Sequence, residues 1–257
     1  MRRAGLVVAD ALAATATAVK PGITTAELDT VAAEVIRSAG ATPSFLGYLG
    51  YPATTCISVN DEIVHGIPGP RVLAEGDTVS IDCGAIVEGW HGDSAVTVQV
   101  GTGSGEAVAL SEATRLAMWH GIAVARLGGR VGDISSAIED YVDSLATPYG
   151  IVGDYTGHGI GSAMHQPPDV PNLGRAGKGP KIMPGMALAI EPMLTAGEPD
   201  NSVLADDWTV VTDDGSIACH WEHTMTVTER GIWVLTSPDG GEAMLAELGA
   251  PFGPLVD

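Results

Sequence analysis

Acidic residues occur inside two apolar, β-branched stretches that are typical of buried strands. Asp82 follows Thr-Val-Ser-Ile, and Asp93 precedes Ser-Ala-Val-Thr-Val. A carboxylate in a buried strand is costly to desolvate unless a positive charge meets it. Because the chain has only 12 Lys and Arg residues against 32 Asp and Glu residues, a metal ion is the favoured partner for these acids.

The same pattern returns later in the chain. The stretch from Gly185 to Glu191 repeats that from Gly76 to Asp82, and Glu222 begins a repeat of the strand that Asp93 begins. Folding the two copies together about a pseudo-twofold axis would gather all four acids, as a pair of divalent cations requires. The alternative is that the acids cap strands or face solvent. Matching positions in two apolar strand pairs argue against it.

Two helices are expected before the strands of each copy. Near the start, Leu6, Val7, Ala9 and Leu12 are spaced as one helix face. A basic start and Ala-rich end also resemble a short signal peptide, but Asp10 interrupts the apolar run and favours a helix. The other expected helices are one that begins at a Thr24–Glu27 capping box, one over Glu106–Leu127 and one over Ile134–Val142.

The duplicated α-α-β unit spans approximately residues 1–100 and 105–235, with no linker between the copies. This predicts a single α+β domain, 1–257, in which both halves share one sheet and one site. Between Glu191 and Glu222 the second copy carries roughly twenty extra residues, which are expected to form a loop that includes Trp208.

The composition excludes several classes of protein. A formal net charge of −20 argues against a surface that binds nucleic acid or anionic membranes. No apolar run approaches the length of a membrane span. The 3 Cys residues form no CxxC motif, so neither a disulfide framework nor a thiolate zinc site is indicated, and a reducing compartment is expected.

A histidine flanked by glycines is the second chemical feature of the sequence. His158 lies in Gly-His-Gly-Ile-Gly, and His165 follows seven residues later. Glycine allows close backbone approach, and neutral imidazole is a common ligand of transition metals. One histidine beside four carboxylates suits Mn(II), Fe(II) or Co(II), and less typically Zn(II). The alternative is a structural histidine, but the glycines and His165 favour a ligand.

Together these motifs resemble type I methionine aminopeptidases. The resemblance is carried by GHGIG with the second histidine, IEPM, the HGD after the first acid-bearing strand, EHTMTVT and SVNDEIVHGIP, and it runs from the first helix to about Leu235. It implies the pita-bread fold, a curved antiparallel sheet with helices on its outer face. It also implies hydrolysis of the N-terminal methionine when the second residue is small, at two divalent cations (Co, Mn, Fe or Zn).

The resemblance assigns roles to individual residues. Asp82, Asp93, His158, Glu191 and Glu222 would ligate the cations, with Asp93 and Glu222 bridging them and Glu191 also carrying a proton to the leaving amine. Non-ligand catalytic histidines that also bind substrate would be His65 and His165. From the residues alone, these two could equally be a turn residue and a packing residue.

A methionine pocket is also implied by the resemblance. Its lining would be Tyr48, Tyr51, Cys56 and Trp208, with Phe45 and Met164 at the wall. Aromatic, thiol and thioether groups suit a thioether side chain. Without the resemblance these residues would be interpreted as ordinary core. The remaining histidines are expected to be structural or on the surface: His91, His120, His220 and His223.

The chain departs from the family in three places. Met164 replaces a frequent Phe and Gly84 a frequent Thr, which affects the shape of the pocket and not the ligand set. The chain also begins close to its first helix, without the short leading segment of many relatives, so looser packing of that helix is expected.

Three other functions share this fold. A prolidase or aminopeptidase P would have the same ligands, but usually carries a further N-terminal domain for which the chain leaves no room. A metal-free binding module or a creatinase-like enzyme would lack ligand acids that are present here.

The expected setting is the cytoplasm, where the protein would act as a monomer on the N-termini of nascent polypeptides. Transient association with the ribosome is expected, although the acidic sequence shows no evident docking patch. No direct contact with nucleic acid or membrane is expected.

Overall fold

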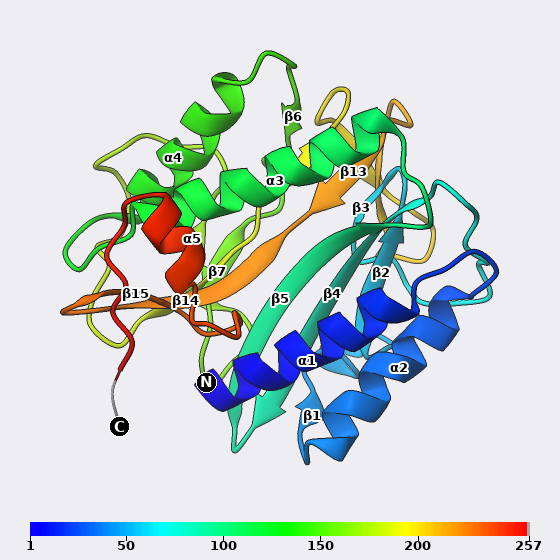
Figure 1. The fold of residues 1–257 in the computed structure, drawn as a ribbon, viewed down its shortest axis with the longest axis horizontal. Helices are drawn as coiled ribbons and strands as arrows, with labels where there is room; N and C mark the ends of the chain where they lie inside the picture. Colours follow the sequence, from blue (N-terminus) through cyan, green and yellow to red (C-terminus); the bar gives the residue numbers. More distant parts are fainter. Residues whose placement is uncertain (256–257) are drawn as a thin grey trace.

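The computed structural model describes residues 1–255. The largest sheet in this part of the chain has nine strands, and neighbouring strands are antiparallel. The main path through this sheet is β1-β4-β5-β14-β9-β7-β8, and β2 and β15 pair with β4 and β14. The four long helices lie over one face of the sheet (Figure 1). The strands are β1 (Thr42–Pro43), β2 (Thr55–Val59), β4 (Thr78–Val87), β5 (Trp90–Gln99), β7 (Gly157–Gly159), β8 (Gln166–Val170), β9 (Ala187–Ile190), β14 (Glu222–Thr228) and β15 (Gly231–Val234).

The sheet shows the predicted duplication. Its central strands run β2-β4-β5 from the first half of the chain and β14-β9-β7 from the second, in mirrored order about the β5–β14 junction. The expected α+β fold, with two related halves that share an antiparallel sheet, is therefore confirmed. Because β5 and β14 are neighbours, residues on one face of the two halves meet at the centre of the sheet.

The helices begin and end close to the predicted residues: α1 (Arg2–Ala18), α2 (Thr25–Ser38), α3 (Gly105–Ala123), α4 (Val131–Asp143) and a short α5 (Glu242–Glu247). The Thr24 side chain accepts from the Glu27 N–H, and the Glu27 side chain accepts from the Thr24 N–H at 2.8 Å, so the capping box is confirmed. Helix α3 is shorter than expected and ends at Ala123. No helix among residues 1–255 is long and apolar enough to cross a membrane.

The predicted buried face of α1 is only partly correct. The predicted Leu12 is buried together with Ala4, Val8 and Ala11, whereas the predicted Leu6 is 36% exposed. A methyl group added at Gly5 would lie 2.2 Å from the Leu235 carbonyl oxygen, and one at Gly92 would lie 2.7 Å from the Gly5 nitrogen. The helix therefore packs on β5 through its small residues, and the expected loose packing is also wrong.

The stretch between Glu191 and Glu222 is not a loop. It forms four short strands, which pair with two strands from elsewhere in the chain to give two sheets of three strands each. The expectation of a loop in this stretch is corrected accordingly. These strands are β10 (Met193–Thr195), β11 (Asn201–Val203), β12 (Val210–Thr212) and β13 (Ala218–His220), with β3 (Glu62–Val64) and β6 (Gly150–Ile151) as partners.

Candidate metal centre

The structure brings all five predicted ligands to one cavity of about 210 Å³. Asp82 and Asp93 lie on the paired strands β4 and β5, where Gly84 is opposite Asp93. Glu222 begins β14 and is opposite Ala95 of β5. The remaining two come from the second half of the sheet: His158 is in the middle of β7, and Glu191 directly follows β9.

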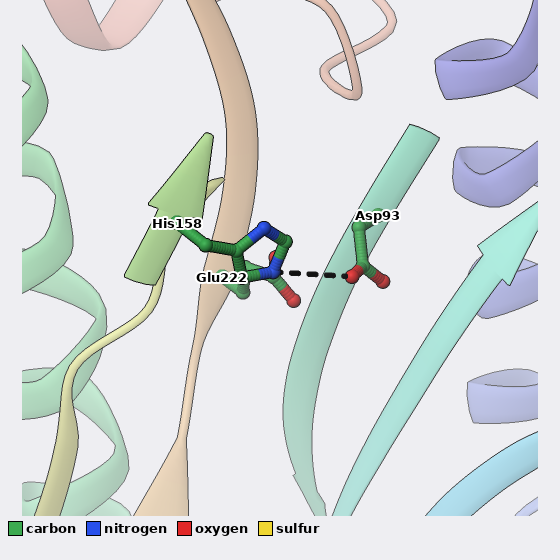
Figure 2. A group of neighbouring side chains, drawn as sticks. All are labelled: Asp93, His158 and Glu222. Atoms are coloured by element: carbon green, nitrogen blue, oxygen red, sulfur yellow. Dashed lines mark ion pairs between the residues drawn. The ribbon is translucent and has the colours of Figure 1, made fainter. Parts of the chain in front are cut away.

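Three of these side chains form a compact cluster. Asp93, His158 and Glu222 each offer one ligand atom, and these atoms lie within 4.8 Å of one another (Figure 2). The Nε2 atom of His158 is 3.8 Å from Asp93 Oδ2 and 3.5 Å from Glu191 Oε1. Asp82 lines the same cavity. The arrangement surrounds a small volume with oxygen atoms and one nitrogen atom, as a cation site requires.

Burial makes these carboxylates costly in the absence of a cation. It raises the pKa of Asp82 to about 7, and burial together with neighbouring carboxylates holds the pKa values of Asp93, Glu191 and Glu222 well above their ordinary range. Among residues 1–255, no Lys or Arg forms an ion pair with any of the four. Oxygen atoms without a hydrogen-bond partner occur on Asp82, Asp93 and Glu222. Divalent cations would satisfy both the charge and these atoms, so the residues fit a metal centre.

His158 is prepared to act as a neutral ligand. Its Nδ1 atom is 2.9 Å from the Gly159 carbonyl oxygen, which can only accept, so Nδ1 carries the proton and Nε2 presents a lone pair to the cavity. Burial lowers the pKa of His158 to about 4. The flanking glycines are required for close approach, because a methyl group at Gly157 would lie 2.3 Å from the Ala189 carbonyl oxygen.

His65 and His165 line the same cavity without being part of the ligand cluster. The His165 Nδ1 atom is 2.9 Å from the Tyr48 hydroxyl, and its ring lies edge-on to that of His158 at 4.2 Å. His65 has a φ of 61°, a strained backbone conformation for a non-glycine residue. Burial lowers the pKa of His65 to about 4, so its imidazole is neutral at physiological pH.

The six predicted pocket residues pack together beside the acids. Phe45, Tyr51, Cys56 and Met164 are buried, with Tyr48 and Trp208 packed against them. All six line the cavity that holds the acids. The Tyr51 ring meets that of Trp208 edge-on at 5.0 Å, and the Tyr51 hydroxyl is held 3.0 Å from the Thr55 carbonyl oxygen. The cavity is therefore lined on one side by packed apolar side chains and on the other by the carboxylates.

Sequence reasoning missed Leu49, which lines the cavity, and one histidine beside it. His220, predicted to be structural or on the surface, is buried, and its Nε2 atom is 3.7 Å from Glu191 Oε2. A signal was available, because residues two apart in an extended chain face the same side and His220 precedes Glu222 by two positions. The other three have structural contacts: His91 with Ser44, His120 stacked on Tyr141, and His223 with Thr236.

Comparison with known proteins gives consistent results. Residues 1–229 match metallopeptidase family M24. The chain is 53% identical to methionine aminopeptidase 1 of Mycobacterium tuberculosis, covering 92% of this chain and 91% of the relative. It is 47% identical to methionine aminopeptidase 1 of Bacillus subtilis, covering 92% and 94%.

Solved structures show the same likeness. The methionine aminopeptidase of Thermotoga maritima superimposes with a TM-score of 0.90 at 41% identity, over 92% of this chain and 95% of that one. A prolidase from Pyrococcus furiosus superimposes with a TM-score of 0.72 at 20% identity, over 92% of this chain and 62% of that one. The second likeness concerns the fold alone, which is the expected pita-bread fold.

Proposed function

Because this chain belongs to metallopeptidase family M24, we propose that Asp82, Asp93, His158, Glu191 and Glu222 hold two divalent cations at the centre of its sheet. The enzyme is a hydrolase that removes the N-terminal methionine from proteins and peptides. One observation carries the assignment of the site: five donor groups, which have no Lys or Arg partner in the described part of the chain, share a cavity with an apolar pocket.

Each group has a task that suits its position. Bound divalent cations would polarise the scissile carbonyl group and lower the pKa of water. Asp93 and Glu222, which come from the two halves of the sheet, would hold the cations jointly. Glu191 would carry a proton to the leaving amine, because its carboxylate lies in the cavity beside His158, with Oε1 3.5 Å from Nε2. His65 and His165 would hydrogen-bond the substrate at the mouth of the site.

The methionine side chain would occupy the space between Tyr51, Cys56 and Trp208. These groups bury apolar surface, and the sulfur of a substrate thioether favours aromatic neighbours. The cavity has a closed floor of carboxylates, so a substrate would enter with its N-terminal residue innermost. Discrimination would then be steric at the second residue, with small side chains accepted and large ones excluded by the rim.

The substrate preference has a direct test. Chelator-treated protein supplied with Mn, Fe, Co or Zn should cleave Met-Ala-Ser and should not cleave Xaa-Pro substrates. Asp93→Ala and Glu222→Ala should abolish the cleavage, whereas Asp10→Ala, on an exposed face of α1, should retain it. Cleavage of Met-Ala-Ser by either site variant after chelation would overturn the assignment, and a preference for Xaa-Pro would identify a prolidase.

The cellular setting is also a proposal. Three buried free cysteines suit the reducing cytoplasm, and nascent N-termini would be the substrates of a monomer. Although the sequence shows no evident docking patch, basic side chains lie together around the start of α4, and none forms an ion pair within the described chain: Arg126, Arg130, Arg175, Lys178 and Lys181. We propose that this cluster supports transient ribosome association. Salt-sensitive cosedimentation with ribosomes should weaken in Lys178→Glu/Lys181→Glu, and unchanged cosedimentation would contradict this role.

A further inference from the structure

We propose that His220 is a positioning residue that fixes the orientation of Glu191 through a hydrogen bond from its Nε2–H group. The inference rests on the proposed metal centre and adds a residue outside the ligand set. His220 comes from β13, the last short strand of the stretch that the first half of the chain lacks. The second half of the chain thus supplies both the proposed ligand Glu191 and the residue that positions it.

The backbone of His220 is fixed by both acid-bearing strands of the first half. Its N–H donates to Ser80 Oγ at 3.2 Å and to Thr97 Oγ1 at 3.1 Å. The Thr97 hydroxyl in turn donates to the His220 carbonyl oxygen at 2.7 Å. Residue 220 is also paired with Met193 of β10. Because these contacts fix the backbone, the imidazole can move only by rotation about its side-chain torsion angles.

The imidazole lacks a hydrogen-bond partner at its inner nitrogen. The residue is 2% exposed, and among residues 1–255 Nε2 has no partner within bonding distance. In the tautomer that carries its proton on Nε2, a buried donor without a partner favours a nearby acceptor. Among the described residues, the carboxylate within ion-pair range of this nitrogen is that of Glu191, whose Oε2 atom is 3.7 Å away. A shift of a few tenths of an ångström completes the bond.

The two oxygens of Glu191 then have separate partners. Oε1 is 3.5 Å from His158 Nε2 and faces the ligand cluster, whereas Oε2 faces His220. Glu191 follows the end of β9, so strand pairing does not restrain it as it restrains Asp82. A donor on Oε2 would prevent rotation of the carboxylate and keep Oε1 directed at the cation. Such supporting bonds typically change metal affinity by about 10–100-fold when they are removed.

Three variants separate this role from simple packing. His220→Leu removes the donor, His220→Asn keeps a polar amide that is too short to reach Glu191, and His220→Gln keeps a donor at similar reach. Competition between each protein and a chelator for Mn(II) gives the affinity, and Met-Ala-Ser hydrolysis gives kcat and KM. The matched control is His120→Leu, whose ring stacks on Tyr141 outside the cavity.

We expect about 10–100-fold weaker binding of at least one cation in the Leu and Asn variants, with a lower kcat and a nearly unchanged KM. The Gln variant and the His120 control should stay near the wild-type values. If His220→Leu does not fold, the Asn–Gln comparison decides the question. Wild-type affinity in the Asn variant, or equal losses in Asn and Gln, would overturn the positioning role. Failure of the wild-type protein to cleave Met-Ala-Ser would instead refute the proposed function.

Discussion

Raising the pH from 6.5 to about 8 should destabilise the metal-free protein. The cause is the group of buried carboxylates, because the pKa of Asp82 is raised to about 7 and those of Asp93, Glu191 and Glu222 are raised well above the ordinary range. The folded state therefore binds protons that the unfolded state has already released. The free energy of unfolding must fall as the pH rises through these folded-state pKa values.

Histidines have the opposite effect. Burial lowers the pKa values of His65 and His158 to about 4 and that of His220 to about 3, from an ordinary value of 6.5. The unfolded state then binds protons that the folded state does not, so these groups make stability rise with pH, mostly below pH 6.5. Between pH 6.5 and about 8 each still adds about 0.4 kcal/mol, because half of each unfolded-state imidazole is protonated at pH 6.5. The difference between the wild type and a variant of Asp82, in which the histidines are unchanged, therefore isolates the carboxylate.

The size of the effect follows from the pKa values. Titration of Asp82 alone across this interval removes about 1 kcal/mol, and the other three acids can only add to it. For a chain of this size, about 1 kcal/mol corresponds to a Tm shift of about 2–4 °C. An added divalent cation should reverse the trend, because its binding displaces protons and strengthens as the acids ionise.

Urea unfolding of chelator-treated protein at the two pH values measures this directly. Asp82→Asn should flatten the pH dependence, whereas Asp10→Asn on the exposed side of α1 should leave it unchanged. The same pH dependence in Asp82→Asn as in the metal-free wild type would refute the conclusion that Asp82 is an unpaired acid in a buried site.

Three further predictions concern packing. Gly84→Thr places a Cβ atom 2.7 Å from Ser44 Cβ and 2.9 Å from the Phe45 ring, so it should cost about 1–3 kcal/mol in urea unfolding and raise KM for Met-Ala-Ser; an unchanged KM would show that the pocket wall is elsewhere. Gly5→Ala should lower the free energy of unfolding by about 1–3 kcal/mol or more, since the added methyl group would meet the Leu235 carbonyl oxygen. Wild-type stability of this variant would contradict the close packing of α1 on the sheet. Thr24→Ala should cost about 1 kcal/mol through loss of the α2 cap without changing kcat, and no loss of stability would exclude the capping box.

Much of the centre could be predicted because its signals are local and repeated. Asp82 and Asp93 are out of place in apolar strands, and the second copy presents Glu191 and Glu222 in matching positions. Duplication then determines that the acids meet, since β5 and β14 become neighbours. The cap of α2 was predictable for a similar reason, because both partners lie within one turn. The role of the five residues as ligands stays a prediction.

Features that depend on distant contacts were not predictable. The face that α1 buries is decided by how closely Gly5 and Gly92 allow backbones to approach, which apolar spacing does not reveal. The strands of the stretch after Glu191 form only because they find partners in β3 and β6, which lie far away in sequence. His220 enters the site through that same pairing, and the sequence offers as its signal only the position two residues before Glu222.

The central claim is that side chains from both halves of the chain jointly hold a pair of divalent cations. Equilibrium dialysis of chelator-treated protein against Co(II), followed by metal analysis, tests it most directly. We expect two ions per chain in the wild type and a loss of binding in Asp93→Asn/Glu222→Gln, which removes one carboxylate charge from each half. Co(II) content that is negligible in the wild type, or unchanged in the double variant, would contradict the account.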